Sequence, residues 1–109
     1  MLPFSGWRRL ALVGLSLLAT AFAHAQPVRI GSTLALTGPL SATAQIHKLV
    51  GEIYVEQLNK RGGLLGRPVE WIVKDDQSKP DVARTLYEQL ITADKVDLLM
   101  GPYATGAIL

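Results

Sequence analysis

The chain has 109 residues, a length that suggests one domain at most. It contains no cysteine, which excludes disulfides, a thiol nucleophile and a lipid-modified cysteine anchor. Its formal net charge of +2 comes from Arg8 and Arg9, since the remaining chain carries nine basic and nine acidic residues. This balance, without a basic run, argues against nucleic acid as a partner.

Residues 1–25 have the pattern of a secretory signal peptide. Arg8 and Arg9 form its basic start, and Leu10 to Phe22 is an apolar stretch too short for a comfortable membrane span. Ala23-His24-Ala25 fits an A-x-A cleavage site. We therefore expect cleavage after Ala25 and a periplasmic mature chain, residues 26–109. Retention of the segment as an N-terminal anchor is the alternative.

The first predicted strand runs from Val28 to Leu36. Its apolar and β-branched residues form a nearly continuous run, which indicates burial on both faces in the middle of a parallel sheet. Thr37-Gly38-Pro39 is a turn signal that ends the strand. Ligands of open α/β sheets bind beyond the carboxyl ends of such strands, so the loop from Thr37 to Ser41 is the first candidate binding surface.

A helix is expected from Ser41 to Lys60, with Ser41 capping its N-terminus. It should end before Gly62-Gly63, where glycine adopts the left-handed cap conformation. Apolar residues at helical spacing predict a stripe that is buried in the fold. The members of this stripe are Ile46, Val50, Ile53, Tyr54 and Leu58.

The same pattern then repeats along the chain. A second strand is predicted over Val69–Lys74, a second helix over about Pro80–Ala93, and a third strand over Val96–Met100. The order β-α-β-α-β with short links predicts a parallel sheet with right-handed crossovers, the start of a Rossmann-like α/β lobe. The first and third strands should be neighbours, which places the loop Gly101–Thr105 across one crevice from the first loop. The apolar stripe expected on the second helix is Val82, Leu86, Leu90 and Ile91.

Hydroxyl groups and free backbone N–H groups at these two loops are the candidate ligand contacts. At helix N-termini such groups bind carboxylates well, because unpaired donors and the helix dipole point at the ligand. Ordinary helix capping is the alternative role. It is the favoured role for Ser41 alone, whereas for Thr105 the pattern supports both roles equally. The polar candidates are Thr37, Ser41, Thr43, Tyr103 and Thr105.

No stretch of the chain carries a convincing catalytic, nucleotide-binding or metal-binding motif. Gly62–Gly66 follows a helix and precedes a strand, the reverse of the dinucleotide fingerprint, and Gly101–Gly106 lacks the Lys-Ser/Thr of a phosphate loop. Asp75-Asp76 is expected to serve loop solvation and helix capping. His24 and His47 are too scattered for a metal site, and His47 is expected at the helix surface. We expect no cofactor, no metal and no enzymatic activity.

The chain from Pro27 to Ile108 resembles the periplasmic solute-binding proteins of ABC importers, of the leucine/isoleucine/valine-binding type. The resemblance is carried by the order and spacing of short motifs, none of which is specific alone. They are Ile30-Gly31, Leu36-Thr37-Gly38-Pro39-Leu40, Asn59-Lys60-Arg61-Gly62-Gly63, Gly66-Arg67-Pro68-Val69, Asp75-Asp76-Gln77, Pro80, Leu90-Ile91, Asp94-Lys95-Val96 and Met100-Gly101-Pro102-Tyr103.

The resemblance implies a two-lobed type I clamshell that closes on an amino acid or similar small solute and docks on a membrane permease. Thr105 looks like the hydroxyl that holds the ligand's α-carboxylate, with Tyr103 and Ala104 beside it. The loop with Thr37, Gly38, Pro39 and Ser41 would line the side-chain pocket. Thr43 stands where several amino-acid binders carry an aromatic residue. This departure leaves aromatic acids, amides, urea and other carboxylates open beside branched-chain amino acids.

Such proteins are much longer than this chain, and Gly106–Leu109 looks like the beginning of a helix. We therefore expect residues 26–109 to be a partial N-terminal lobe of a longer protein. A ligand-sensing module of a receptor or regulator is the alternative to the transport component. An enzyme on a similar fold would need a nucleophile or an acid–base pair at the two loops, and the sequence shows no convincing one there.

Overall fold

The computed structural model describes residues 25–108, so the predicted signal peptide lies outside the described residues except for Ala25. The described chain contains one three-stranded parallel sheet in the order β2-β1-β3. The predicted parallel α/β arrangement and the neighbouring placement of the first and third strands are confirmed. The strands are β1 (Val28–Leu34), β2 (Val69–Asp75) and β3 (Leu98–Leu99).

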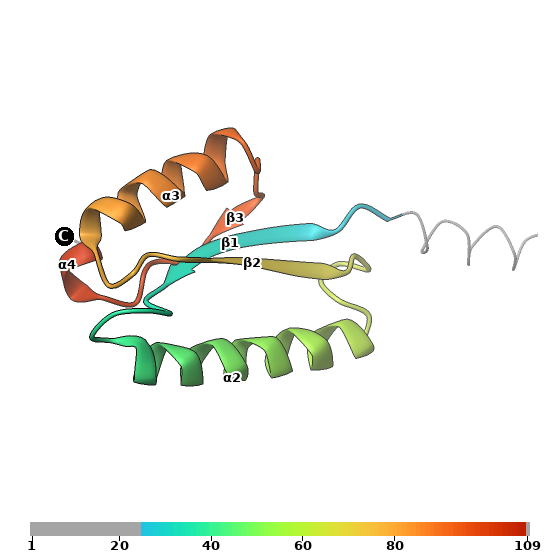
Figure 1. Cartoon of the computed structure of the whole chain (residues 1–109). Helices are drawn as coiled ribbons and strands as arrows, with labels where there is room; N and C mark the ends of the chain where they lie inside the picture. Colours follow the sequence, from blue (N-terminus) through green and yellow to red (C-terminus); the bar gives the residue numbers. More distant parts are fainter. Residues whose placement is uncertain (1–24, 109) are drawn as a thin grey trace, which may run out of the picture.

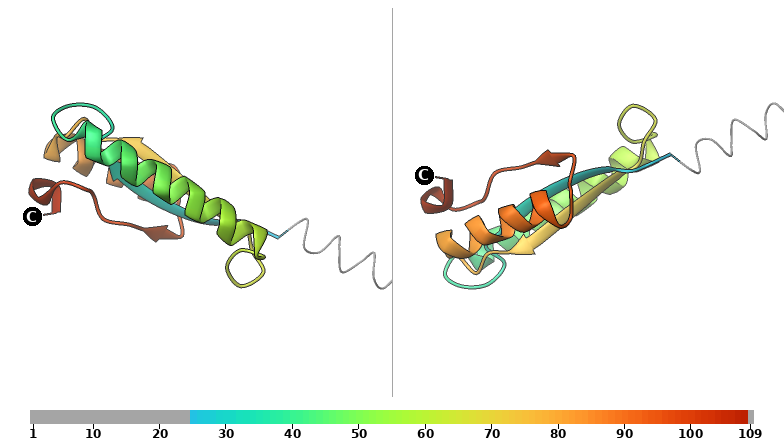
Figure 2. Two further views of the ribbon diagram at one scale, coloured as in Figure 1. Left: turned by 90° about the horizontal axis from the view of Figure 1, so that it is seen from below. Right: turned by 90° about the horizontal axis from the view of Figure 1, so that it is seen from above.

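Two helices lie on opposite faces of this sheet (Figure 1). Helix α2 (Ser41–Lys60) covers one face and α3 (Pro80–Thr92) the other, so the sheet is the middle of three layers. The short helix α4 (Thr105–Ile108) follows β3 and lies at the end of the sheet where β1 terminates, as two further views show (Figure 2). None of the helices in residues 25–108 is both long and apolar enough to cross a membrane.

The central strand β1 contains the longest buried run of residues 25–108. Every residue from Gly31 to Ala35 is buried, which confirms the predicted burial on both faces. Its register with β2 runs from Val28 opposite Val69 to Leu34 opposite Asp75. The strand ends two residues earlier than predicted, because the chain turns where the Leu36 N–H bonds to the Leu34 carbonyl at 2.9 Å.

The third strand is shorter than predicted, two residues instead of five. At its start the Val96 N–H donates to the Leu90 carbonyl at 3.1 Å, so the backbone of this residue is bonded to the end of α3 rather than to the sheet. After Leu99 the Met100 carbonyl accepts a hydrogen bond from the Tyr87 hydroxyl instead of from β1. Both ends of the strand are therefore limited by contacts with α3.

The face of α2 that meets the sheet differs from the predicted stripe, which is wrong for four of its five members. Ile46, Val50, Ile53 and Tyr54 are 46–61% exposed rather than buried, although Tyr54 borders an apolar hollow next to Trp71 of β2. The sheet-facing residues are smaller or later in the helix: Ala44, Gly51, Val55 and Leu58. Helix α2 is apolar on two faces, and periodicity alone could not tell which of them the sheet covers.

Gly51 lets α2 approach β2 closely. A Cβ atom at this position would lie 2.2 Å from the Trp71 ring, so only glycine fits. The ring is itself fixed, since its Nε1–H donates to the Ser32 hydroxyl on β1 at 2.9 Å. This close contact between α2 and β2 therefore depends on the absence of a side chain at residue 51, and a glycine gives no hydrophobic signal in the sequence.

The start of α2 also differs from expectation. Leu40 is the N-cap residue and makes no side-chain capping bond, while Ser41 is the first helical residue, so the predicted capping by Ser41 is wrong. The turn before it places Gly38 at φ +88°, with Gln77 so near that a Cβ atom would meet its carbonyl oxygen at 2.8 Å. Crowding against the loop after β2 therefore determines how the chain enters α2.

At the other end of α2, Gly62 and Gly63 have positive φ angles, as predicted. Helix α3 begins with Pro80 in its first turn and buries Leu90, also as predicted, and it carries Asp81 near its N-terminus. Ile91 is exposed, so its assignment to the buried stripe is wrong; Ala83 is buried instead.

Gly51→Ala should lower the free energy of unfolding by about 1–2 kcal/mol, because the added methyl group overpacks the contact with Trp71. At an uncrowded helical site the same change would raise stability by about 1 kcal/mol through helix propensity. Urea unfolding followed by circular dichroism measures the difference. Gln57→Ala, on the exposed side of α2, is the control, and an increase in stability for Gly51→Ala would contradict the close contact.

Candidate functional site

The loop after β1 is fastened to the end of β2 by one carboxylate. Asp75 Oδ2 accepts a hydrogen bond from the Thr37 hydroxyl at 2.6 Å. Its Oδ1 accepts from the backbone N–H groups of Thr37 at 3.1 Å and Gln77 at 2.8 Å. The hydroxyl of Thr37, a predicted ligand contact, is therefore already engaged within the protein.

The neighbouring carboxylate, that of Asp76, bonds β1 at a buried position rather than at the loop. Asp76 is 1% exposed, and its Oδ2 accepts from the Thr33 hydroxyl of β1 at 2.8 Å. Its Oδ1 accepts from the Ser78 N–H at 3.0 Å. Loop solvation is therefore the wrong role for Asp76. Helix capping is wrong for both carboxylates, because Lys79 is the N-cap of α3 and it makes no side-chain capping bond.

A serine hydroxyl completes the connection between the two loops. Ser78 Oγ donates to the Thr37 carbonyl at 2.8 Å and accepts from the Leu40 N–H at 3.3 Å. The loop from Thr37 to Ser41 is thus held at both of its ends by the segment that follows β2. Gly38 and Pro39 between these ends are exposed.

These bonds affect the titration of Asp75. Partial burial by itself would raise the pKa of its carboxyl group. Hydrogen bonds from the Thr37 hydroxyl and from the backbone N–H groups of Gln77, Thr37 and Leu36 outweigh that effect and lower the pKa below its ordinary value. The charged form of Asp75 is the one that the folded loop stabilises.

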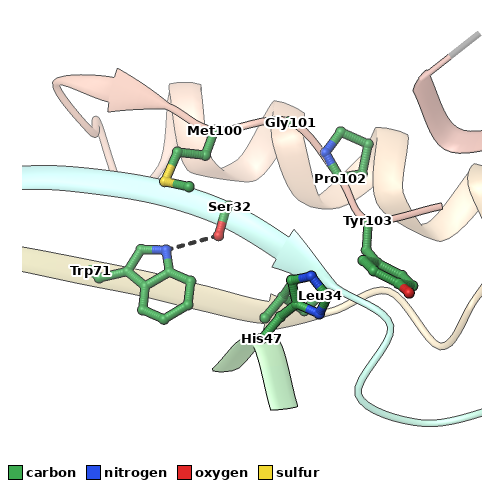
Figure 3. A pocket seen from close by; sticks show the side chains of 8 residues that line it. All are labelled: Ser32, Leu34, His47, Trp71, Met100, Gly101, Pro102 and Tyr103. Carbon is green, nitrogen blue, oxygen red and sulfur yellow. Dashed lines mark hydrogen bonds between the residues drawn. The ribbon is translucent and has the colours of Figure 1, made fainter. Parts of the chain in front are cut away.

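A pocket of about 290 Å³ opens on the α2 side of the sheet, beneath the chain that follows β3 (Figure 3). Its wall is mostly apolar, and the side chains come from β1, β2, α2 and the loop after β3. The volume is at the small end of the range for small-molecule sites, where apolar walls with a few polar groups are the rule. The lining residues are Ser32, Leu34, His47, Trp71, Met100, Gly101, Pro102 and Tyr103.

His47 brings a polar group from α2 to this pocket. Its ring lies 4.9 Å from the Tyr103 ring, centroid to centroid, at an interplanar angle of 57°. Its Nδ1 lies 2.9 Å from the Thr43 carbonyl oxygen, which can only accept, so Nδ1 carries the proton and Nε2 is an acceptor in the neutral ring. His47 is exposed, as predicted for the surface of the helix, but its place in the lining of a pocket was not predicted. The i, i+4 spacing from Thr43, already a candidate, is the signal that could have found it.

The predicted site residues fall into two groups. Tyr103 lines the pocket, and Thr43 lies one turn of α2 before His47, so these two belong to the same region. Ala104 follows Tyr103 half-buried, and Thr105 is exposed at the start of α4. The second group, Thr37, Gly38, Pro39 and Ser41, does not line the pocket; it lies in the loop that is bonded to the end of β2.

In residues 25–108 no group of three or more histidine, cysteine, aspartate and glutamate side chains is arranged to hold a metal ion. The polar groups of the pocket are a serine hydroxyl that accepts a bond from Trp71, a histidine and a tyrosine. What this arrangement can do chemically is bind the apolar part of a small solute and offer it a few hydrogen bonds.

Comparison with known proteins gives a consistent result. A family model described as periplasmic binding protein matches residues 27–109. The chemotactic signal transduction system substrate-binding protein BasB of Halobacterium salinarum is 37% identical over 83 residues, 74% of this chain and 20% of that protein. The Leu/Ile/Val-binding protein BraC3 of Rhizobium johnstonii is 30% identical over 94 residues, 86% of this chain and 25% of that protein.

The fold is also shared with a solved structure. The branched-chain amino acid transporter substrate-binding protein LivJ of Streptococcus pneumoniae, in complex with isoleucine, superposes with a TM-score of 0.72 at 28% identity, over 76% of this chain and 24% of that protein. The chain thus spans a fifth to a quarter of the length of the relatives that it matches.

Replacing Asp75 by asparagine should lower the free energy of unfolding by about 1–2 kcal/mol at pH 7, because the amide cannot reproduce both sets of accepted hydrogen bonds. Since folding lowers the pKa of Asp75, its contribution is complete above the unfolded-state pKa of about 4 and is lost as the pH falls through the folded-state value.

The difference between wild type and Asp75→Asn should therefore shrink toward zero at acidic pH in urea unfolding curves. Glu88→Gln, an exposed carboxylate on α3, is the control and should show no such convergence. A constant difference between pH 7 and pH 3 would contradict the role assigned to the charged carboxylate.

Proposed function

This chain belongs to the periplasmic binding protein family, and from that premise we propose that it forms the N-terminal part of the first lobe of a substrate-binding component of an ABC importer. The observation that carries the proposal is the family match over residues 27–109 together with a pocket at the carboxyl edge of β1 and β3. That edge is where parallel α/β sheets bind ligands.

The proposed ligand is a branched-chain amino acid or a related small carboxylate or amide solute. The mostly apolar pocket beside Tyr103 suits an aliphatic or aromatic group. Thr105, with Ala104 before it, would bond the ligand's carboxylate, and Thr43 and the exposed Gly38-Pro39 turn would complete the rim. The isoleucine in the LivJ structure and the name of BraC3 support this ligand class.

The proposed mechanism is closure of two lobes around the solute, followed by delivery to permease subunits in the membrane. In the first lobe the loop after β1 is hydrogen-bonded to the end of β2 and to the segment after it. We therefore expect this loop to keep its conformation while the two lobes move relative to each other. The place of action is the periplasm, reached through a signal peptide cleaved after Ala25. Residues 27–109 match a family of binding proteins, which supports a binding role rather than a catalytic one.

The proposal is tested by isothermal titration calorimetry of the full-length protein with L-isoleucine, L-leucine and benzoate. We expect saturable binding of at least one probe with a dissociation constant in the micromolar range or below, and a raised melting temperature in its presence. Benzoate separates a requirement for the amino group from a requirement for the carboxylate alone. The absence of binding by all three probes would contradict the proposed ligand class.

Thr105→Ala should weaken binding of the best probe about tenfold, because one hydrogen bond to a charged carboxylate is lost. Because Thr105 is exposed, we expect the change to leave the melting temperature unaltered, and thermal unfolding without ligand checks this. Thr85→Ala, which removes an exposed hydroxyl on α3, is the matched control. Equal affinities for wild type and Thr105→Ala would remove Thr105 from the site.

A further inference from the structure

The hydroxyl of Tyr87 lies between the backbones of β1 and the chain after β3, where a direct hydrogen bond of the sheet would be expected. Tyr87, on α3, accepts a hydrogen bond from the Thr33 N–H of β1 at 3.2 Å. The same hydroxyl donates to the Met100 carbonyl, just after β3, at 2.5 Å. One side chain from the helix layer therefore bridges the backbones of two neighbouring strands.

The ladder itself shows what this bridge replaces. Strand pairing ends with Gly31 opposite Leu99, and the next bond runs from the Met100 N–H to the Gly31 carbonyl at 2.9 Å. In an evenly spaced parallel ladder the bond after that would join the Thr33 N–H to the Met100 carbonyl. These are the two groups that the Tyr87 hydroxyl binds, so it is inserted between them.

We propose that Tyr87 is a positioning residue for ligand binding, which holds the chain after β3 away from β1 and thereby sets the width of the pocket beside Tyr103. The inference rests on the proposed solute-binding function. It concerns a residue that does not itself line the pocket, because Tyr87 lies on α3, on the opposite face of the sheet from α2.

The Tyr87 hydroxyl bonds the first residue of the pocket wall that follows β3. Met100, whose carbonyl Tyr87 binds, is followed directly by Gly101, Pro102 and Tyr103, and all four residues line the pocket. On the other side of the bridge, Thr33 lies between Ser32 and Leu34, which line it from β1. The separation of these two walls therefore depends on whether a hydroxyl or a direct bond joins Thr33 to Met100.

The tyrosine is held firmly enough to act in this way. Leu90, less than one turn further along α3, is 0% exposed, and Ala83, one turn before Tyr87, is 2% exposed. A Cβ atom at Gly31 would lie only 3.0 Å from the Leu90 side chain, so α3 rests directly on the β1 backbone. With α3 fixed there, the backbone of Tyr87 is held at a set distance from β1, within reach of the ladder.

The test is Tyr87→Phe in the full-length protein, with Tyr54→Phe as the matched control. Tyr54 is an exposed residue of α2, and its hydroxyl makes no hydrogen bond with other described residues. In Tyr87→Phe the hydroxyl is absent, so the Thr33 N–H and the Met100 carbonyl can bond to each other directly. We expect this bond to narrow the pocket. Affinities for L-isoleucine and benzoate are measured by calorimetry, and backbone amide shifts by NMR.

We expect Tyr87→Phe to change the ratio of the two affinities by about fivefold or more, and to shift the amide resonances of Gly101 and Tyr103 while those of α2 stay in place. A purely structural loss would weaken both probes equally. An unchanged affinity ratio with unchanged loop resonances would overturn the inference. A wild-type protein that binds none of L-isoleucine, L-leucine and benzoate would contradict the proposed ligand class, and the loop resonances would then decide the positioning role alone.

Discussion

Two adjacent carboxylates at the end of β2 hold the carboxyl edge of the sheet together. Asp76 bonds the Thr33 hydroxyl inside the fold, and Asp75 bonds Thr37 in the loop above it. Consecutive strand residues point to opposite faces, so one pair can serve both the core and the rim. The entry into α2 depends on the rim contact, because the loop that leads to it is bonded at both ends to the segment after β2.

The order of elements could be predicted from the sequence because each has a strong local signal. The buried run of β1, the Gly62-Gly63 end of α2 and Pro80 at the start of α3 all acted as expected. Contacts that depend on small residues could not be found in this way. Gly51 decides which face of α2 meets the sheet, and a glycine contributes nothing to a hydrophobic pattern.

For the candidate pocket, the edge of the sheet and the presence of Tyr103 in the lining could be predicted from the sequence, whereas most of its polar contacts could not. Topology alone places the loops after β1 and β3 beside each other. Three contacts arise only in the folded chain: Asp75 binds Thr37, the His47 ring lies tilted beside the Tyr103 ring, and the Tyr87 hydroxyl enters the ladder. Each joins residues more than ten positions apart, where neither spacing nor propensity carries information.

The fastening of the β1 loop has a consequence for the thermodynamics of association. Ordering a free loop costs roughly 1–2 kcal/mol of conformational entropy per residue. Here the Thr37 N–H and hydroxyl and the Leu40 N–H already have partners before any solute arrives. The loop from Thr37 to Leu40 is therefore ordered by folding, and binding of a solute would not have to order it. In the proposed two-lobed protein, more of the free energy of contact would then be available to favour the closed form over the open one.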